Sequence, residues 1–154
     1  MTAGARPDAA VGASPPTGGL LVVGFDGSAA SARAVRWAIE LARPVRGRLC
    51  LVFAHHANAR LAEPRTEEEV DSPARAVAQA MRTLVREADA AGLSAETISE
   101  EGAPAEVLLR IARERSAVGI VVGTRGLGGA ARLILGSVSA RLVAVAPVPV
   151  TVVP

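Results

Sequence analysis

Short apolar runs alternate along this chain with longer segments of helical periodicity. Residues 20–25 form the first run, which ends at a turn-forming Asp-Gly-Ser sequence, and a helical stripe of apolar residues continues to about Ala42. Strands that alternate with helices form a parallel sheet covered by helices on both faces. With 154 residues, close to the size of one domain, the sequence predicts a single doubly wound α/β domain.

The alternation continues to the end of the chain and gives the order β-α-β-α-β-α-β-α-β. Residues 1–18 are rich in Ala, Gly, Pro and Ser without periodicity, so we expect a disordered tail there and a domain over 19–154. The polar segment from His55 to Asp71 is expected to be a surface loop. The expected strands are 20–25, 48–54, 94–100, 118–123 and 149–153, and the expected helices begin at Ser28 or Ser31, Ser72-Pro73, Gly102-Ala103-Pro104 and Gly136-Ser137.

Composition excludes several classes of function. The net charge is only +2, and the aromatic residues are two Phe and one Trp, so a nucleic-acid-binding surface built on base stacking is not expected. Every basic residue is Arg, which excludes mechanisms that need lysine, such as a Walker P-loop or a Schiff base. No apolar run is long enough to span a membrane or to serve as a signal peptide, so we expect a cytoplasmic protein.

The cysteine and histidine residues do not indicate a metal or redox centre. The single cysteine, Cys50, lies in an apolar run and is expected to be a small buried side chain. His55 and His56 are neighbours on an extended segment, so they point to opposite faces, and no cluster of metal ligands surrounds them in the sequence. The run Glu67–Glu69 is expected to be a solvated loop. We therefore expect no metal site made by the protein alone.

Two loops carry chemistry that fits the ligand site of an open α/β sheet, which lies beyond the carboxyl ends of the strands. One is 24–28, after the first strand, and the other begins at Gly123 with the spacing Gly-x2-Gly-x9-Gly-Ser. Glycines let backbone N–H groups approach a ligand, and a helix N-terminus at Ser137 favours an anion. Glycines in such loops are also ordinary turn formers. If phosphates bind here, they lie against Gly126, Gly136, Ser137 and Val138, with Arg125 adding charge.

Asp26 allows two interpretations. It is a turn or helix-capping residue, or it accepts from a ribose hydroxyl or lies near a divalent metal carried by phosphates. Both roles are compatible with one structure. Ser28 has no His and Asp partners of the triad type, and no pair of carboxylates indicates acid–base catalysis. The sequence therefore favours a binding module over an efficient enzyme, and no catalytic residue is assigned.

Three segments resemble the universal stress protein family. Leu21-Val-Val-Gly-Phe-Asp-Gly-Ser28 resembles its opening strand and turn, and Ile120-Val-Val-Gly-Thr-Arg-Gly-Leu-Gly-Gly129 its fourth strand and glycine loop. Leu133-Ile-Leu-Gly-Ser-Val-Ser139, followed by Pro147-Val-Pro-Val-Thr-Val-Val153, resembles its last helix and strand. The resemblance covers about residues 20–153. Its most specific part is the glycine–serine spacing, which is typical of the ATP-binding branch.

The resemblance implies a fold, a partner and a ligand. The fold is a five-stranded parallel sheet of order 3-2-1-4-5, Rossmann-like and related to the adenine nucleotide alpha hydrolases. The partner is a second copy, joined through the C-terminal edge strand, which would otherwise be an exposed pairing edge. The ligand is ATP, with Mg carried by its phosphates, and adenine packs around Phe53 and Ala54. The implied binding residues are Asp26, Ser28, Ala54, Val122, Gly123, Thr124, Arg125, Gly126, Gly136, Ser137, Val138 and Ser139.

Three hypotheses of function follow. The first is a dimeric, ATP-binding regulator or sensor of the stress response, with slow or no hydrolysis. The second is a protein-interaction or chaperone-like module whose pocket is empty or holds another adenine nucleotide, such as cyclic AMP. The third is an enzyme on the same scaffold that uses Asp26 with a divalent metal. The glycine–serine spacing favours the first, and the missing acid–base residues disfavour the third.

Overall fold

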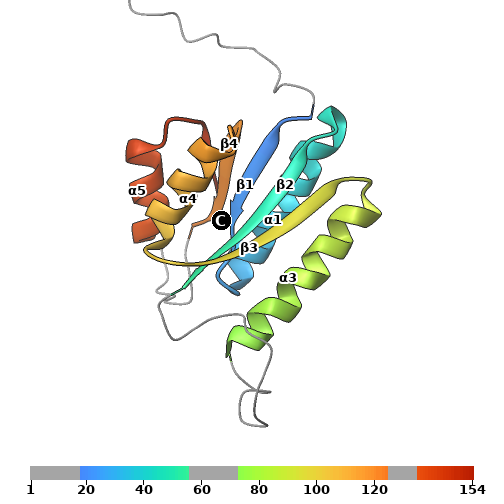
Figure 1. The fold of residues 1–154 in the computed structure, drawn as a ribbon, viewed down its shortest axis with the longest axis horizontal. Helices are drawn as coiled ribbons and strands as arrows, with labels where there is room; N and C mark the ends of the chain where they lie inside the picture. Colours follow the sequence, from blue (N-terminus) through green and yellow to red (C-terminus); the bar gives the residue numbers. More distant parts are fainter. Residues whose placement is uncertain (1–17, 56–72, 125–134) are drawn as a thin grey trace, which may run out of the picture.

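A computed structural model describes residues 18–55, 73–124 and 135–154 of the chain. Within these residues strands and helices alternate as the sequence predicts (Figure 1). A short 3-10 helix, η1, follows the first helix directly. The elements are β1 (Leu20–Gly24), α1 (Ala29–Ala42), η1 (Arg43–Val45), β2 (Arg48–His55), α3 (Pro73–Ala90), β3 (Ser94–Glu101), α4 (Pro104–Glu114), β4 (Gly119–Gly123), α5 (Ser137–Val145) and β5 (Val150–Val153).

The strands form one parallel sheet of order β3-β2-β1-β4-β5, which confirms the predicted fold class and strand order. The central strand β1 pairs with β2 on one side and with β4 on the other. The chain therefore moves outward in one direction as far as β3 and then returns to the other side of β1. The carboxyl ends of β1 and β4 lie side by side at this reversal, where ligands bind in sheets of this kind.

Helices cover both faces of the sheet. In Figure 1, α1 and α3 lie on one side of it and α4 and α5 on the other. Successive side chains of β1 point to opposite faces of the sheet and so contact both helix layers. Val23 packs with the residues of α1 and α3, and Val22 packs with those of α4 and α5. Neither valine is exposed to solvent. A strand buried on both faces explains why its sequence is continuously apolar.

Each strand differs from the expected one by one residue at one end, and the ends of β2 and α5 have identifiable physical reasons. β2 continues to His55 because the N–H of Gly102 donates to the His55 C=O at 3.0 Å and extends its pairing with β3. The expectation that the loop begins at His55 was therefore wrong, and this side chain is buried. At the other boundary, α5 ends at Val145 because Ala146 is extended (ψ 137°), as the residue before Pro147 prefers to be.

The remaining expectations on segments concern residues outside the described ranges. Residues 1–17, 56–72 and 125–134 are among these, so the N-terminal tail, the 19–154 domain boundary and the surface loop stay predictions. Among the helices of the described ranges, none combines the length and the apolar character that crossing a membrane requires. The cytoplasmic location stays a prediction as well.

Candidate functional site

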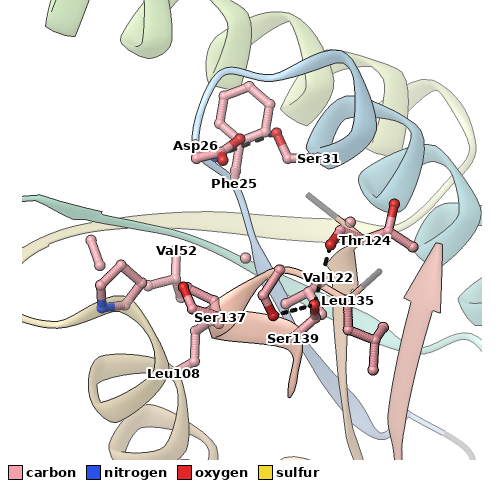
Figure 2. A pocket seen from close by; sticks show the side chains of 16 residues that line it. Phe25, Asp26, Ser31, Val52, Leu108, Val122, Thr124, Leu135, Ser137 and Ser139 are labelled. Carbon is pink, nitrogen blue, oxygen red and sulfur yellow. Dashed lines mark hydrogen bonds between the residues drawn. The ribbon is translucent and has the colours of Figure 1, made fainter. Parts of the chain in front are cut away.

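A pocket of about 510 Å³ opens at the carboxyl ends of β1 and β4 (Figure 2). This volume lies in the range of pockets that hold small molecules and cofactors. Figure 2 shows Asp26 and Ser31 on one side of it and Ser137 and Ser139 on the opposite side. The lining residues are Gly24, Phe25, Asp26, Ser31, Val52, Ala54, Pro104, Leu108, Val122, Gly123, Thr124, Leu135, Gly136, Ser137, Val138 and Ser139.

The turn between β1 and α1 satisfies its own polar groups. The Asp26 carboxylate accepts from the backbone N–H of Ser28 at 2.9 Å, and the Ser28 hydroxyl accepts from the N–H of Ser31 at 3.1 Å. Gly27 between them has φ +86°, a left-handed conformation that favours glycine. The first turn of α1 is thus capped by Ser28, and one carboxylate oxygen of Asp26 is already engaged.

The N-terminus of α5 differs because no side chain caps it. Its N-cap residue is Gly136, which has no side chain to accept a hydrogen bond. Within the described ranges, no group accepts from the N–H groups of Ser137, Val138 and Ser139, and the Ser137 hydroxyl has no partner. These three amides and one hydroxyl line the pocket, so the positive end of the α5 dipole is available to an anion.

Hydrogen bonds hold this helix start in place. The N–H of Gly136 donates to the Thr124 C=O at 2.8 Å, and the Ser139 hydroxyl lies 3.2 Å from the same carbonyl oxygen. Thr124 in turn donates its N–H to the C=O of Val153 at 2.8 Å. β4 ends at Gly123, where an added Cβ would lie 2.8 Å from the backbone carbon of Ala30. Glycine therefore lets β4 and α5 approach the first turn of α1 closely.

Charge is distributed unequally between the two sides of the pocket. Among its described lining residues, Asp26 is the one ionisable side chain. It lies on the α1 side, while the positive end of the α5 dipole lies on the other side. A ligand with an anionic end and a hydroxyl-bearing middle matches this polarity, because the anion lies against α5 and the hydroxyls face the carboxylate.

The remaining wall of the pocket is apolar and comes from β2 and α4. Val52 and Ala54 contribute from the end of β2, and Pro104 and Leu108 from α4. Because side chains alternate along a strand, Phe53 points to the opposite face, where it packs in the core below α1 and α3. Phe53 therefore does not line the pocket, whereas Ala54 does, and the packing of adenine around these two residues stays a prediction.

The end of β2 also offers backbone polar groups. The N–H of Phe25 donates to the Val52 C=O at 2.9 Å, so the even-numbered residues of β2 direct their backbone groups towards β1. Two residues beyond Val52, no strand residue lies beside β2 on this side, because the chain that follows β1 turns away at Asp26. The N–H and C=O of Ala54 point towards that position, at the edge of the pocket. They present one donor and one acceptor beside an apolar wall.

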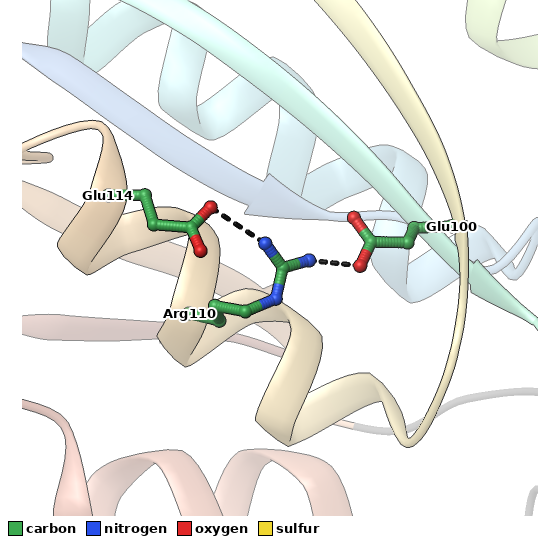
Figure 3. A network of polar contacts seen from close by, with 3 residues as sticks. All are labelled: Glu100, Arg110 and Glu114. Atoms are coloured by element: carbon green, nitrogen blue, oxygen red, sulfur yellow. Dashed lines mark hydrogen bonds and ion pairs between the residues drawn. The ribbon is translucent and has the colours of Figure 1, made fainter.

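An ion-pair network joins α4, which forms this wall, to β3. Figure 3 shows the Arg110 guanidinium between two carboxylates, Glu114 one turn later on α4 and Glu100 on β3. The bond to Glu114 is 2.7 Å long. The hydrogen bonds to Glu114 and then to Glu100 raise the pKa of Arg110 above its ordinary value. The pairs are exposed, so we expect them to orient α4 rather than to stabilise the fold strongly.

Most of the predicted site residues come together on this pocket. Ser28 is the exception, because its hydroxyl caps α1 and it does not line the pocket. Arg125 and Gly126 lie outside the described residues. The others are on the lining: Asp26, Ala54, Val122, Gly123, Thr124, Gly136, Ser137, Val138 and Ser139.

Sequence reasoning missed several lining residues. Ser31 is one turn into α1, and its position beside Asp26 follows from the cap geometry at Ser28. Val52 could have been found from strand alternation, since it shares a face with Ala54. Pro104 and Leu108 come from α4, which is distant in sequence, and no local signal marks them.

The other chemically interesting residues lie apart from the pocket. Cys50 is fully buried in β2, and burial raises the pKa of its thiol to about 11. His55 packs against the ring of Phe53, with 5.6 Å between ring centroids. In the part of the chain that the structure describes, no group of three or more His, Cys, Asp or Glu residues is placed to hold a metal ion.

Comparisons with known proteins agree on one family. The family model described as the Universal stress protein family matches residues 20–154. A universal stress protein of Thermus aquaticus is 36% identical over 140 residues, which cover 86% of this chain and 96% of that protein. Similarity therefore extends over nearly the whole length of both chains.

Solved structures of similar fold contain adenine nucleotides. A universal stress protein in complex with cAMP is 29% identical, with a TM-score of 0.67 over 89% of this chain and 97% of that one. A universal stress protein from Archaeoglobus fulgidus in complex with dAMP is 21% identical, with a TM-score of 0.65 over 88% and 97% of the two chains. The second likeness supports the fold alone.

Proposed function

Because this chain belongs to the universal stress protein family, we propose that its pocket binds an adenine nucleotide, ATP in particular. The uncapped start of α5 carries this proposal. Three N–H groups and the Ser137 hydroxyl face a cavity without partners among the described residues, whereas α1 beside it is capped by its own Ser28. A helix start of this kind binds phosphate without lysine. A similar protein binds cAMP, which supports an adenine nucleotide as the class of ligand.

The polarity of the pocket orients the nucleotide. The phosphates lie against α5, with any Mg carried by them, because the dipole favours negative charge there. The ribose lies beside Asp26, whose carboxylate accepts hydrogen bonds from hydroxyl groups. Adenine enters the apolar wall of Val52 and Leu108, where the N–H and C=O of Ala54 match the acceptor and donor on the edge of the base. Arg125 and Gly126 complete the phosphate site in this proposal.

The proposed role is that of a regulator or sensor with slow or no hydrolysis. Asp26 is the one carboxylate on the described lining, and one of its oxygens already accepts from Ser28. A general base must hold the attacking water in line with the bond that breaks, and a carboxylate facing the ribose is not in that position. The bound nucleotide, rather than its turnover, is then the signal that a partner protein reads.

The Ser137→Ala variant is expected to bind ATP about tenfold more weakly, because it removes a hydroxyl donor to a charged phosphate. Isothermal titration calorimetry with Mg-ATP measures the change. The matched control is Ser99→Ala, an exposed serine on β3 away from the pocket, which should bind as the unmodified protein does. Equal affinity in both variants would contradict the phosphate position.

The content of the purified protein separates the ATP proposal from its rival. Mass spectrometry of the denatured protein should identify about one released ATP per chain. A protein that holds another adenine nucleotide, or an empty one that Mg-ATP does not stabilise against heat, would support the second function, a protein-interaction or chaperone-like module. That function is kept because most of the described pocket lining is apolar and Asp26 is its one ionisable side chain.

We also propose that two copies associate through the free edge of β5. The N–H of Ile120 donates to the Pro149 C=O and the N–H of Thr124 to the Val153 C=O, so the odd-numbered residues of β5 face β4. The N–H and C=O groups of Val150 and Val152 therefore face outward. Among the described residues no strand pairs with this side of β5, and such an edge with apolar side chains is a ready pairing surface.

The Val152→Pro variant is expected to be monomeric, because proline removes an outward N–H while leaving the bonds to β4 intact. Sedimentation velocity measures the change, with thermal unfolding as the check that the fold survives. Val150→Pro removes the other outward N–H and serves as a second variant if the first does not fold. A dimer that persists in a folded proline variant would place the interface elsewhere.

A further inference from the structure

The surface of α1 carries two large apolar side chains that the monomer leaves exposed. Trp37, the only tryptophan of the chain, is 53% exposed, and Leu41, four residues later, is 39% exposed. Residues four apart share one side of a helix, so the two form a continuous apolar patch. The pocket described above does not use them.

Hydrogen bonds on either flank of α1 show which way this patch faces. Arg36 donates to Glu87 of α3 at 2.9 Å, so its flank faces α3. Arg33 donates from Nε to the C=O of Pro154 at 2.8 Å, so its flank faces the end of β5. Trp37 and Leu41 follow Arg33 by about one and two turns on that second flank. The patch therefore lies beside β5, on the side away from α3.

The free edge of β5 is too small to make an interface by itself. The strand has four residues, whereas a stable interface buries about 800 Å² on each partner and takes about 20 to 30 residues from each. Surface next to the strand must join the contact. The flank of α1 is directly beside β5 and presents apolar side chains, with a tryptophan of the kind that dominates interface energetics.

The spacing of the paired sheet requires large side chains at this place. Antiparallel pairing of two β5 edges keeps the two α1 helices on the same face, because the two-fold axis is perpendicular to the sheet. Each α1 contacts β4 and β1, and the two β4 strands lie three strand spacings apart, about 14 Å. Helices in direct contact pack at about 8–10 Å. Side chains as large as Trp and Leu can fill the extra space between two helices that lie about 14 Å apart.

The register of the pairing fixes which side chains meet. The symmetric pairing that uses the outward N–H and C=O of both Val150 and Val152 puts Thr151 on the two-fold axis. The Arg33 guanidinium lies beside the Pro154 C=O. Side chains point the same way along a helix, so the Trp37 side chain lies about 6 Å and the Leu41 side chain about 12 Å back from it along α1. At about 3.3 Å per strand residue they are level with Val152 and Val150. Each Trp37 then faces the partner's Leu41 across the axis.

We propose that Trp37 and Leu41 of α1 form a self-complementary contact that closes over the paired β5 edges of two copies of this chain. The inference rests on the β5 dimer of the proposed function and extends it to a named surface. A second copy of the chain is the partner that this patch fits, for two reasons. The patch lies next to the edge of β5, and its side chains are large enough to bridge the distance between the two α1 helices.

The single tryptophan makes the test direct. Emission of Trp37 and its quenching by acrylamide are measured over a dilution series, in parallel with sedimentation velocity. We expect blue-shifted, protected emission in the dimer, and a several-fold larger quenching constant in the diluted monomer and in Val152→Pro. Leu41→Glu should raise the dissociation constant of the dimer at least tenfold, since it places a buried charge in the contact.

The matched control is Thr83→Glu, which adds the same charge to an exposed position of α3, and it should dimerise as the unmodified protein does. One outcome would overturn this inference and leave the β5 dimer standing. In that outcome Val152→Pro disrupts the dimer, but acrylamide still quenches Trp37 in the dimer and Leu41→Glu has no effect on dimerisation. A protein that is monomeric at every concentration would overturn both.

Discussion

The Leu142→Ala variant is expected to lose about 3 kcal/mol or more of its free energy of unfolding, the usual cost of a cavity left by a buried leucine. Leu142 is fully buried, and Ser139 is the other buried residue of α5. This one leucine therefore supplies most of the apolar anchoring of the helix to the sheet. Urea unfolding followed by circular dichroism measures the change.

The same variant should weaken nucleotide binding, because the first turn of α5 forms the proposed phosphate site. Leu142 does not line the pocket, so any loss of affinity is transmitted through the position of the helix. The control is Val145→Ala, which truncates an exposed valine of the same helix and should change stability little. A loss below about 1 kcal/mol in Leu142→Ala would show that α5 is held mainly by its hydrogen bonds to Thr124.

Stability should fall steeply between pH 9 and pH 11 because of Cys50. Burial, followed by the nearby charge of Glu96, raises the pKa of this thiol from its ordinary value of 9.0 to about 11. In that window the unfolded chain releases the proton and the folded chain keeps it, so rising pH favours unfolding. The whole loss is about 3 kcal/mol.

The composition of the chain isolates this effect. The chain contains neither lysine nor tyrosine, and arginine keeps its proton above pH 12, so no other side chain titrates between pH 9 and 11. Urea unfolding at a series of pH values measures the slope. The Cys50→Ala variant should show a nearly flat profile over the same range. Parallel profiles in the two proteins would contradict the assignment to Cys50.

Local sequence patterns predicted the elements because their signals act over short distances. The Asp-Gly-Ser turn and the cap at Ser28 each depend on a few neighbouring residues, and both are confirmed. Even the weakly patterned third strand was placed correctly. The errors are at ends such as His55, where pairing with a distant strand sets the boundary.

Site residues whose position depends on local backbone conformation could be predicted from the sequence, whereas those whose position depends on packing between elements could not. Gly136 and Ser137 could be placed on the pocket because a helix start without a capping side chain is visible in the sequence around Gly136. Ser28 was assigned to the ligand, but the hydroxyl caps its own helix. Phe53 was assigned to the base, but the pleat of β2 turns it to the other face.

The alternation of strands and helices and the family could be predicted from local patterns, because short-range periodicity and turn chemistry require no knowledge of distant contacts. That Pro104 and Leu108 of α4 line one pocket with Asp26, and that Arg33 of α1 reaches the end of β5, is visible in the folded structure and not in the sequence. A pocket and a surface patch are made by elements that meet through packing, and no local pattern records which helix covers which strand.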